Sequence, residues 1–127
     1  MRMKKAKIFH NFSEYENWTK KFNDCYEYEN IPVIIDEKLP NNQTKISCDM
    51  FAQCKSYKTA LRHFEKAFAD YKEGIADWVN TMKESCENGY FKMKDKSGEY
   101  DFYSYEIEQP SENVFYISLI IAGIYTE

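Results

Sequence analysis

The sequence feature that most constrains the fold is a long series of apolar residues at alternating spacings of four and three. At helical pitch, residues so spaced stay on one side of a helix. The series predicts one long amphipathic helix over residues 50–86, and Asn88-Gly89 would end it because glycine accepts the left-handed conformation of a helix C-cap. The members of the series are Met50, Cys54, Tyr57, Leu61, Phe64, Phe68, Tyr71, Ile75, Trp78 and Met82.

The length and width of this apolar face allow two interpretations. A helix this long would span roughly 50 Å, so we expect a break near Lys55-Ser56 or at Gly74. Ala60, Ala67 and Gly74 recur every seven residues beside the series and widen it, as in a helix that lies on a sheet. The alternative is a coiled-coil seam that forms a homo-oligomer through the long helix.

Short runs of alternating or β-branched residues on both sides of this helix predict six strands. Turn-forming residues join the second strand to the third as a hairpin and the last three as a meander. We expect one α+β domain over residues 1–127, with a mainly antiparallel sheet and the order β-α-β-β-α-β-β-β. Its first six elements would form a ferredoxin-like core, extended by a C-terminal hairpin. The expected strands are 5–12, 30–36, 44–48, 90–94, 100–108 and 114–125.

A second, shorter helix is expected near the N-terminus. Residues 13–16 (Ser-Glu-Tyr-Glu) match a capping box, in which the serine oxygen would accept the backbone N–H of Glu16. Tyr15, Trp18 and Phe22 follow at spacings of three and four, which gives this helix one apolar face.

The last expected strand, residues 114–125, is apolar in both of its phases. A strand of this kind is typically covered on both faces. We therefore expect it to lie centrally in the sheet. One phase holds Val114, Tyr116, Ile120 and Ile124, and the other holds Phe115, Ile117, Leu119 and Ile121.

The cysteines and histidines do not form a ligand set. The spacings between Cys48, Cys54 and His63 match no paired zinc motif, and the four cysteines contain no CxxC pair. We expect free thiols, no bound metal and no cofactor. With neither a secretory leader nor an apolar run of about 18 residues, the chain is expected to be a soluble cytoplasmic protein.

Catalytic signatures are also missing from the sequence. There is no GxSxG motif, and the four glycines are never clustered into a phosphate-binding loop. We therefore expect no catalytic residues. The enzymatic alternative is a small metal-dependent nuclease or nucleotide hydrolase, with Asp101, Glu106 and Glu108 as the carboxylates that hold the metal.

The strand over residues 100–108 carries the candidate binding surface. If one phase of this strand turns inward, the other presents aromatic rings and carboxylates to a partner, a combination that suits a protein interface. The alternative is an amphipathic strand whose tyrosine hydroxyls simply face solvent. The candidate partner-binding residues are Tyr100, Phe102, Tyr103, Tyr105, Glu106 and Glu108.

The charge distribution indicates the kind of partner. Net charge is −4, and residues 97–127 contain six acidic residues and no Lys or Arg. This balance disfavours direct binding of nucleic acid, because affinity for phosphates comes from Lys and Arg. An acidic surface can instead occupy the basic groove of another protein.

We expect a non-catalytic inhibitor encoded by a phage or mobile element. It would block a nucleic-acid-handling enzyme, as anti-restriction and anti-CRISPR proteins do, and its partner would be a basic protein such as a nuclease or defence effector. An immunity protein or antitoxin that neutralises a toxin is the alternative, since the same surface would serve it.

Overall fold

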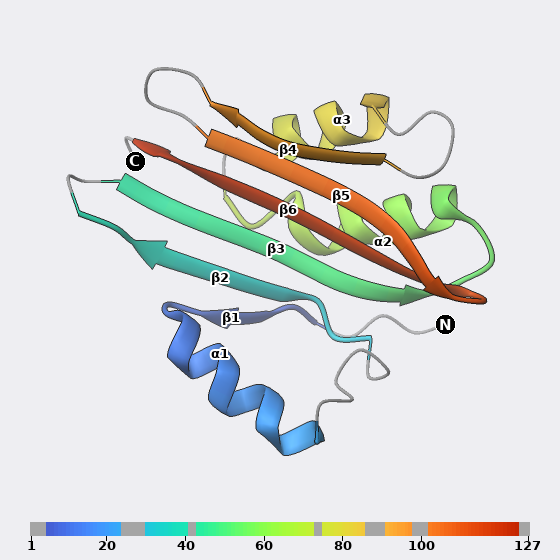
Figure 1. Ribbon diagram of the computed structural model, residues 1–127, viewed down its shortest axis with the longest axis horizontal. Coiled ribbons are helices and arrows are strands. Elements are labelled where there is room, and N and C mark those ends of the chain that lie inside the picture. The colour runs from blue at the N-terminus through green and yellow to red at the C-terminus, as the bar shows by residue number, and fades with distance from the viewer. Residues whose placement is uncertain are drawn as a thin grey trace.

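The computed structural model describes residues 5–23, 30–40, 43–72, 75–85, 91–97 and 102–124. These residues form one six-stranded sheet, with α2 and α3 packed on one face and α1 on the other, beside β1 (Figure 1). The elements are β1 (Lys7–Phe9), α1 (Phe12–Thr19), the 3-10 helix η1 (Lys20–Phe22), β2 (Val33–Lys38), β3 (Gln43–Gln53), α2 (Tyr57–Phe68), α3 (Ile75–Ser85), β4 (Phe91–Ser97), β5 (Phe102–Ser111) and β6 (Val114–Ile124).

The sheet is mixed, and its strand order is β1-β2-β3-β6-β5-β4. Only β1 and β2 pair in parallel, and the other neighbours are antiparallel. The predicted α+β class is therefore confirmed. The ferredoxin-like core is not formed, because a split βαβ unit needs another strand between its two parallel strands, and here β1 and β2 are adjacent.

The prediction of one long helix over residues 50–86 is wrong, because its first residues belong to β3. Along this strand Cys48, Met50 and Ala52 are buried, while the residues between them are half-buried. Alternation of this kind is typical of a strand with one face in the core. The helix begins only after Ser56, whose hydroxyl oxygen accepts the backbone N–H of Thr59 at 3.3 Å as an N-cap.

The rest of the predicted helix is divided into α2 and α3. The first ends at Phe68 and the second begins at Ile75, so the described chain has three α-helices where the sequence predicts two. Gly74, one of the expected break points, lies outside the described residues. The break lets the two shorter helices lie on the same face of the sheet.

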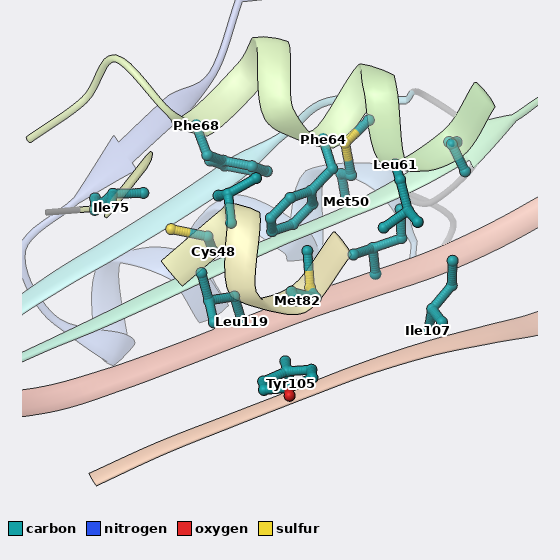
Figure 2. Packing of buried hydrophobic residues seen from close by; sticks show 14 of the residues in the cluster. Cys48, Met50, Leu61, Phe64, Phe68, Ile75, Met82, Tyr105, Ile107 and Leu119 are labelled. Carbon is teal, nitrogen blue, oxygen red and sulfur yellow. The ribbon is translucent and has the colours of Figure 1, made fainter. Parts of the chain in front are cut away.

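The main core lies between these two helices and the sheet. Phe64 and Phe68 of α2, whose ring centroids are 4.6 Å apart, reach toward the strands (Figure 2). Met82 of α3 joins the same cluster together with Leu119 of β6. Most of the apolar stripe predicted as a possible coiled-coil seam thus packs against the sheet, and it is divided between two helices instead of forming one long one.

The N-terminal helix is confirmed, but its cap differs from the prediction. Asn11 is the N-cap: its side-chain oxygen accepts the backbone N–H of Glu14 at 2.9 Å. Glu14 Oε2 in turn accepts the backbone N–H of His10 at 3.3 Å. The N-cap thus lies two residues earlier than expected, and the Glu14 carboxylate caps the residue before it rather than Asn11 itself, so Ser13 lies inside the first turn.

Helix α1 packs through aromatic side chains. Tyr15 and Trp18 lie against Phe9 of β1, with ring centroids 5.9 and 5.4 Å away, and a small second core forms there with Val33 and Ile35 of β2. No residue of α1 is itself fully buried. Within the described residues, the helix packs on the β1–β2 end of its face of the sheet, and its Tyr15 lies near enough to Tyr116 of β6 to raise the pKa of that hydroxyl.

Candidate protein-binding face

One face of β3, β6 and β5 is left without a helix over it in the described part of the chain. Burial alternates along these strands: Met50 and Leu119 face α2 and α3 and are buried, whereas Phe51 and Ile120 face the other way and are half-buried. We call this the open face. The last strand is central as expected, but the helices cover only one of its two faces.

Six residues of the open face form two neighbouring rows across three strands. The register aligns Asp49 with Ser118 and Ser118 with Glu106, and it aligns Phe51 with Tyr116 and Tyr116 with Glu108. Adjacent strands lie about 4.8 Å apart and the two rows about 7 Å apart. We call this set the acidic-aromatic patch: Asp49, Phe51, Glu106, Glu108, Tyr116 and Ser118.

The aromatic part of the patch is a pair of neighbouring rings. The centroids of Phe51 and Tyr116 are 4.8 Å apart and their planes are inclined by 42°. Both side chains are half-buried, so part of each ring remains accessible. Paired rings of this kind offer a rigid apolar surface at a small cost in side-chain entropy.

The acidic part of the patch creates a negative potential around Tyr116. Burial raises the pKa of its hydroxyl above the ordinary value, and the carboxylates of Asp49 and Glu106 raise it further, while a hydrogen bond with Ser118 acts in the opposite direction. Two carboxylates on two different strands thus act on one phenol. A negative potential at a partly accessible ring favours a cationic partner.

Charge on the open face is not entirely of one sign. Among the described side chains of β3, β5 and β6 that face this way, three are acidic (Asp49, Glu106 and Glu108) and one, Lys45, is basic. Lys45 is four residues from Asp49 along β3, about 13 Å away in a strand. On the β4 side, Lys92 is the register partner of Glu106. The carboxylates of β3, β5 and β6 therefore all belong to the patch, and a lysine position lies beside one of them.

The binding residues predicted on β5 lie in different environments in the structure: some are on the open face and one is in the core. Glu106 is half-buried and Glu108 exposed on the open face, as the alternation predicts. Tyr105 is only 3% exposed and packs in the core with Ile107 (Figure 2), so we correct its assignment to the surface.

The other predicted residues of this segment are less fully described. Phe102 and Tyr103 take the first two positions of β5, in register with Ala122 and Ile121. Tyr103 lies two residues from the buried Tyr105, in the same phase of the strand. Tyr100 and Asp101 lie outside the described residues.

Sequence reasoning missed the patch residues on β3 and β6. Phe51 falls at the start of the wrongly predicted helix, and Asp49 falls between that helix and the strand expected over residues 44–48. Tyr116 falls on a strand expected to be covered on both faces. The available signal was the alternation of apolar and polar residues from Ile46 to Met50. That signal identifies a strand with one face outside the core.

The enzymatic alternative gains no support from the geometry. No group of three or more His, Cys, Asp or Glu side chains within the described ranges could hold a metal ion. Glu106 and Glu108 share a face of β5, but Asp101, the third carboxylate of that hypothesis, is not among the described residues.

Comparisons with known proteins add no family assignment. No model of a protein family matches the chain, and no curated protein or solved structure is significantly similar to it. Within the described ranges, every helix is too short or too polar to cross a membrane. Any function must therefore be argued from the fold and the open face.

Proposed function

We propose that this chain is a non-catalytic binding protein that docks on a basic protein through its acidic-aromatic patch. The observation that carries the proposal is the open face itself: two aromatic rings and three carboxylates gathered on three neighbouring strands, with no described helix over them. The helices α2 and α3, on the opposite face, hold the sheet in place.

The composition of the patch supports docking on a protein. Aromatic residues are enriched at the centres of protein interfaces, where they supply most of the binding free energy. Carboxylates around them give charge complementarity, which speeds association and excludes acidic partners. Phe51 and Tyr116 would be the central contacts, with Glu106 and Glu108 beside them.

Because nucleic-acid-handling enzymes have basic surfaces, the proposal extends to this chain being an inhibitor of such an enzyme. A protein that binds DNA or RNA presents Lys and Arg to phosphates, and the carboxylates of the patch would occupy those positions. An anti-restriction or anti-CRISPR protein encoded by a phage or mobile element fits this description. The same chemistry would serve an immunity protein or antitoxin, whose partner would be a toxin.

A charge-reversal comparison tests the proposal. The tagged chain is used for affinity capture from its native host in three forms: wild type, the Glu106→Lys/Glu108→Lys double variant, and Glu84→Lys. Glu84 is exposed on α3, on the opposite side of the sheet, and serves as the matched control. We expect a stoichiometric basic partner with the wild type and the control, and its loss with the double variant.

The identity of the captured protein then separates the finer alternatives. If the partner binds nucleic acid, added DNA or RNA should compete with the chain for it; a toxin would instead lose its activity on binding. Equal recovery of the same proteins by all three forms would contradict docking through the patch, provided that circular dichroism shows all three to be folded.

A further inference from the structure

The patch combines the faces of two aromatic rings with carboxylates, and arginine and lysine side chains would bind to such a combination differently. Phe51 and Tyr116 form an apolar surface whose centroids are 4.8 Å apart. Glu108 is in register with Tyr116, at one end of this row. Asp49 and Glu106 lie in the neighbouring row, on either side of Ser118. A cation placed over the rings would therefore have carboxylates at its margins.

Arginine and lysine would use such a surface differently. A guanidinium group is planar and weakly hydrated, so it stacks on aromatic faces while its N–H groups donate to carboxylates at its edge. An ammonium group is compact and strongly hydrated, and it gains less from an apolar surface. The half-buried state of Phe51 and Tyr116 favours the side chain that loses less hydration on contact.

We infer that the acidic-aromatic patch receives arginine side chains of a partner protein, in preference to lysine, stacked on the Phe51 and Tyr116 rings. This inference rests on the proposed function and narrows it to the chemistry of the contact. Asp49 Oδ1 is buried, so the guanidinium would meet the carboxylates of Glu106 and Glu108, on the strand beside Tyr116.

A second copy of this chain does not fit as the occupant of the patch. Two open faces brought together would oppose the same three carboxylates, and like charges placed opposite one another are destabilising. Lys45 is displaced from the patch along β3 and Lys92 is in register with Glu106 alone, so neither would neutralise Asp49 or Glu108. The charge of the face thus favours an arginine-bearing partner.

Two labelled peptides of equal charge, nona-arginine and nona-lysine, provide the test. Their affinities for the whole chain are measured by fluorescence anisotropy at low and moderate salt, since weak ionic contacts are screened as salt rises. The variants are Phe51→Leu, which keeps an apolar side chain but removes the ring, Glu106→Gln, and Glu84→Gln as the control on α3. Circular dichroism and thermal unfolding check that each variant is folded.

We expect nona-arginine to bind about two- to fivefold more tightly than nona-lysine, the range of an exposed cation–π contact. Phe51→Leu should reduce this preference, because only the Tyr116 ring remains, Glu106→Gln should weaken the binding of both peptides, and Glu84→Gln should change the affinity for neither.

Three other results would overturn the inference, and they differ in whether the proposed function still holds. Equal affinity for both peptides that Glu106→Gln still weakens would remove the arginine preference but leave the proposed function intact. Equal weakening by Glu106→Gln and Glu84→Gln would show diffuse attraction without a patch. If a folded chain binds neither peptide, both the inference and the proposed function fail.

Discussion

The hydroxyl of Tyr71, just beyond the end of α2, donates a hydrogen bond to Asp36 Oδ2 on β2 at 3.0 Å. Lys72 Nζ lies 2.8 Å from the same oxygen, and Asp36 is only 7% exposed. One buried carboxylate therefore binds two consecutive residues at the point where α2 ends. This contact ties the residues that follow α2 to β2.

Replacing Tyr71 by phenylalanine tests the contribution of this contact to stability. The variant keeps the ring but removes a donor to a buried charged group, so the free energy of unfolding should fall by about 1.5–3 kcal/mol. Urea denaturation followed by circular dichroism measures the change. Lys83→Met is the comparison, because it breaks an ion pair with Glu65 in which both side chains are more than one-third exposed, and it should cost at most about 1 kcal/mol. Equal losses of unfolding free energy in the two variants would contradict a stabilising role for the buried Asp36 carboxylate.

The same contact should make stability fall at alkaline pH. Burial, together with the hydrogen bond to Asp36, raises the pKa of Tyr71 from its ordinary value of 10.0 to about 12. The folded state then retains a proton that the unfolded state has lost, so this contribution is fully present below pH 10 and is lost as pH rises toward 12. Urea denaturation between pH 8 and 11 should show a smaller decline for Tyr71→Phe than for the wild type. Parallel declines would assign the pH dependence to other groups.

The class of the fold could be predicted from the sequence, but the helix boundaries could not. Met50 and Cys54 are four residues apart, and an even spacing places two residues on one face of a strand as well as on one face of a helix. Pairing with β6 decides between the two, because Met50 is aligned there with Ile117. That pairing joins segments far apart in the sequence, and local periodicity carries no information about it.

The candidate site was predictable only on β5. Alternation within one strand separates Glu106 and Glu108 from the buried Tyr105, and a single strand is enough for that inference. The patch, however, is made by register across β3, β6 and β5, which places Asp49 and Tyr116 near Glu106. Strand order and register are tertiary properties, so the binding surface could not be assembled from the sequence alone.

The displaced N-cap of α1 gives a direct comparison of two alanine variants. Asn11→Ala removes the oxygen that accepts the Glu14 backbone N–H, and loss of an N-cap typically costs about 1 kcal/mol. Ser13→Ala should be neutral or slightly stabilising, because Ser13 is inside the helix, where alanine has the higher propensity. Thermal and urea unfolding of both variants measure the difference. A larger loss of stability for Ser13→Ala than for Asn11→Ala would instead support Ser13 as the N-cap, as predicted from the sequence.

The described cysteines should differ in reactivity toward alkylation. Cys48 is 1% exposed, and burial, together with the charges of Asp49 and Asp36, raises the pKa of its thiol well above the ordinary value. Cys54 is half-buried, and burial raises the pKa of its thiol as well. Because the thiolate is the reactive form, iodoacetamide at pH 8 should modify Cys54 slowly and Cys48 only when the chain unfolds. Peptide mass spectrometry over a time course, with the guanidinium-unfolded chain as the control in which both react, distinguishes the two. Native modification of Cys48 as fast as that of Cys54 would show that the face of β3 under α2 and α3 opens to solvent.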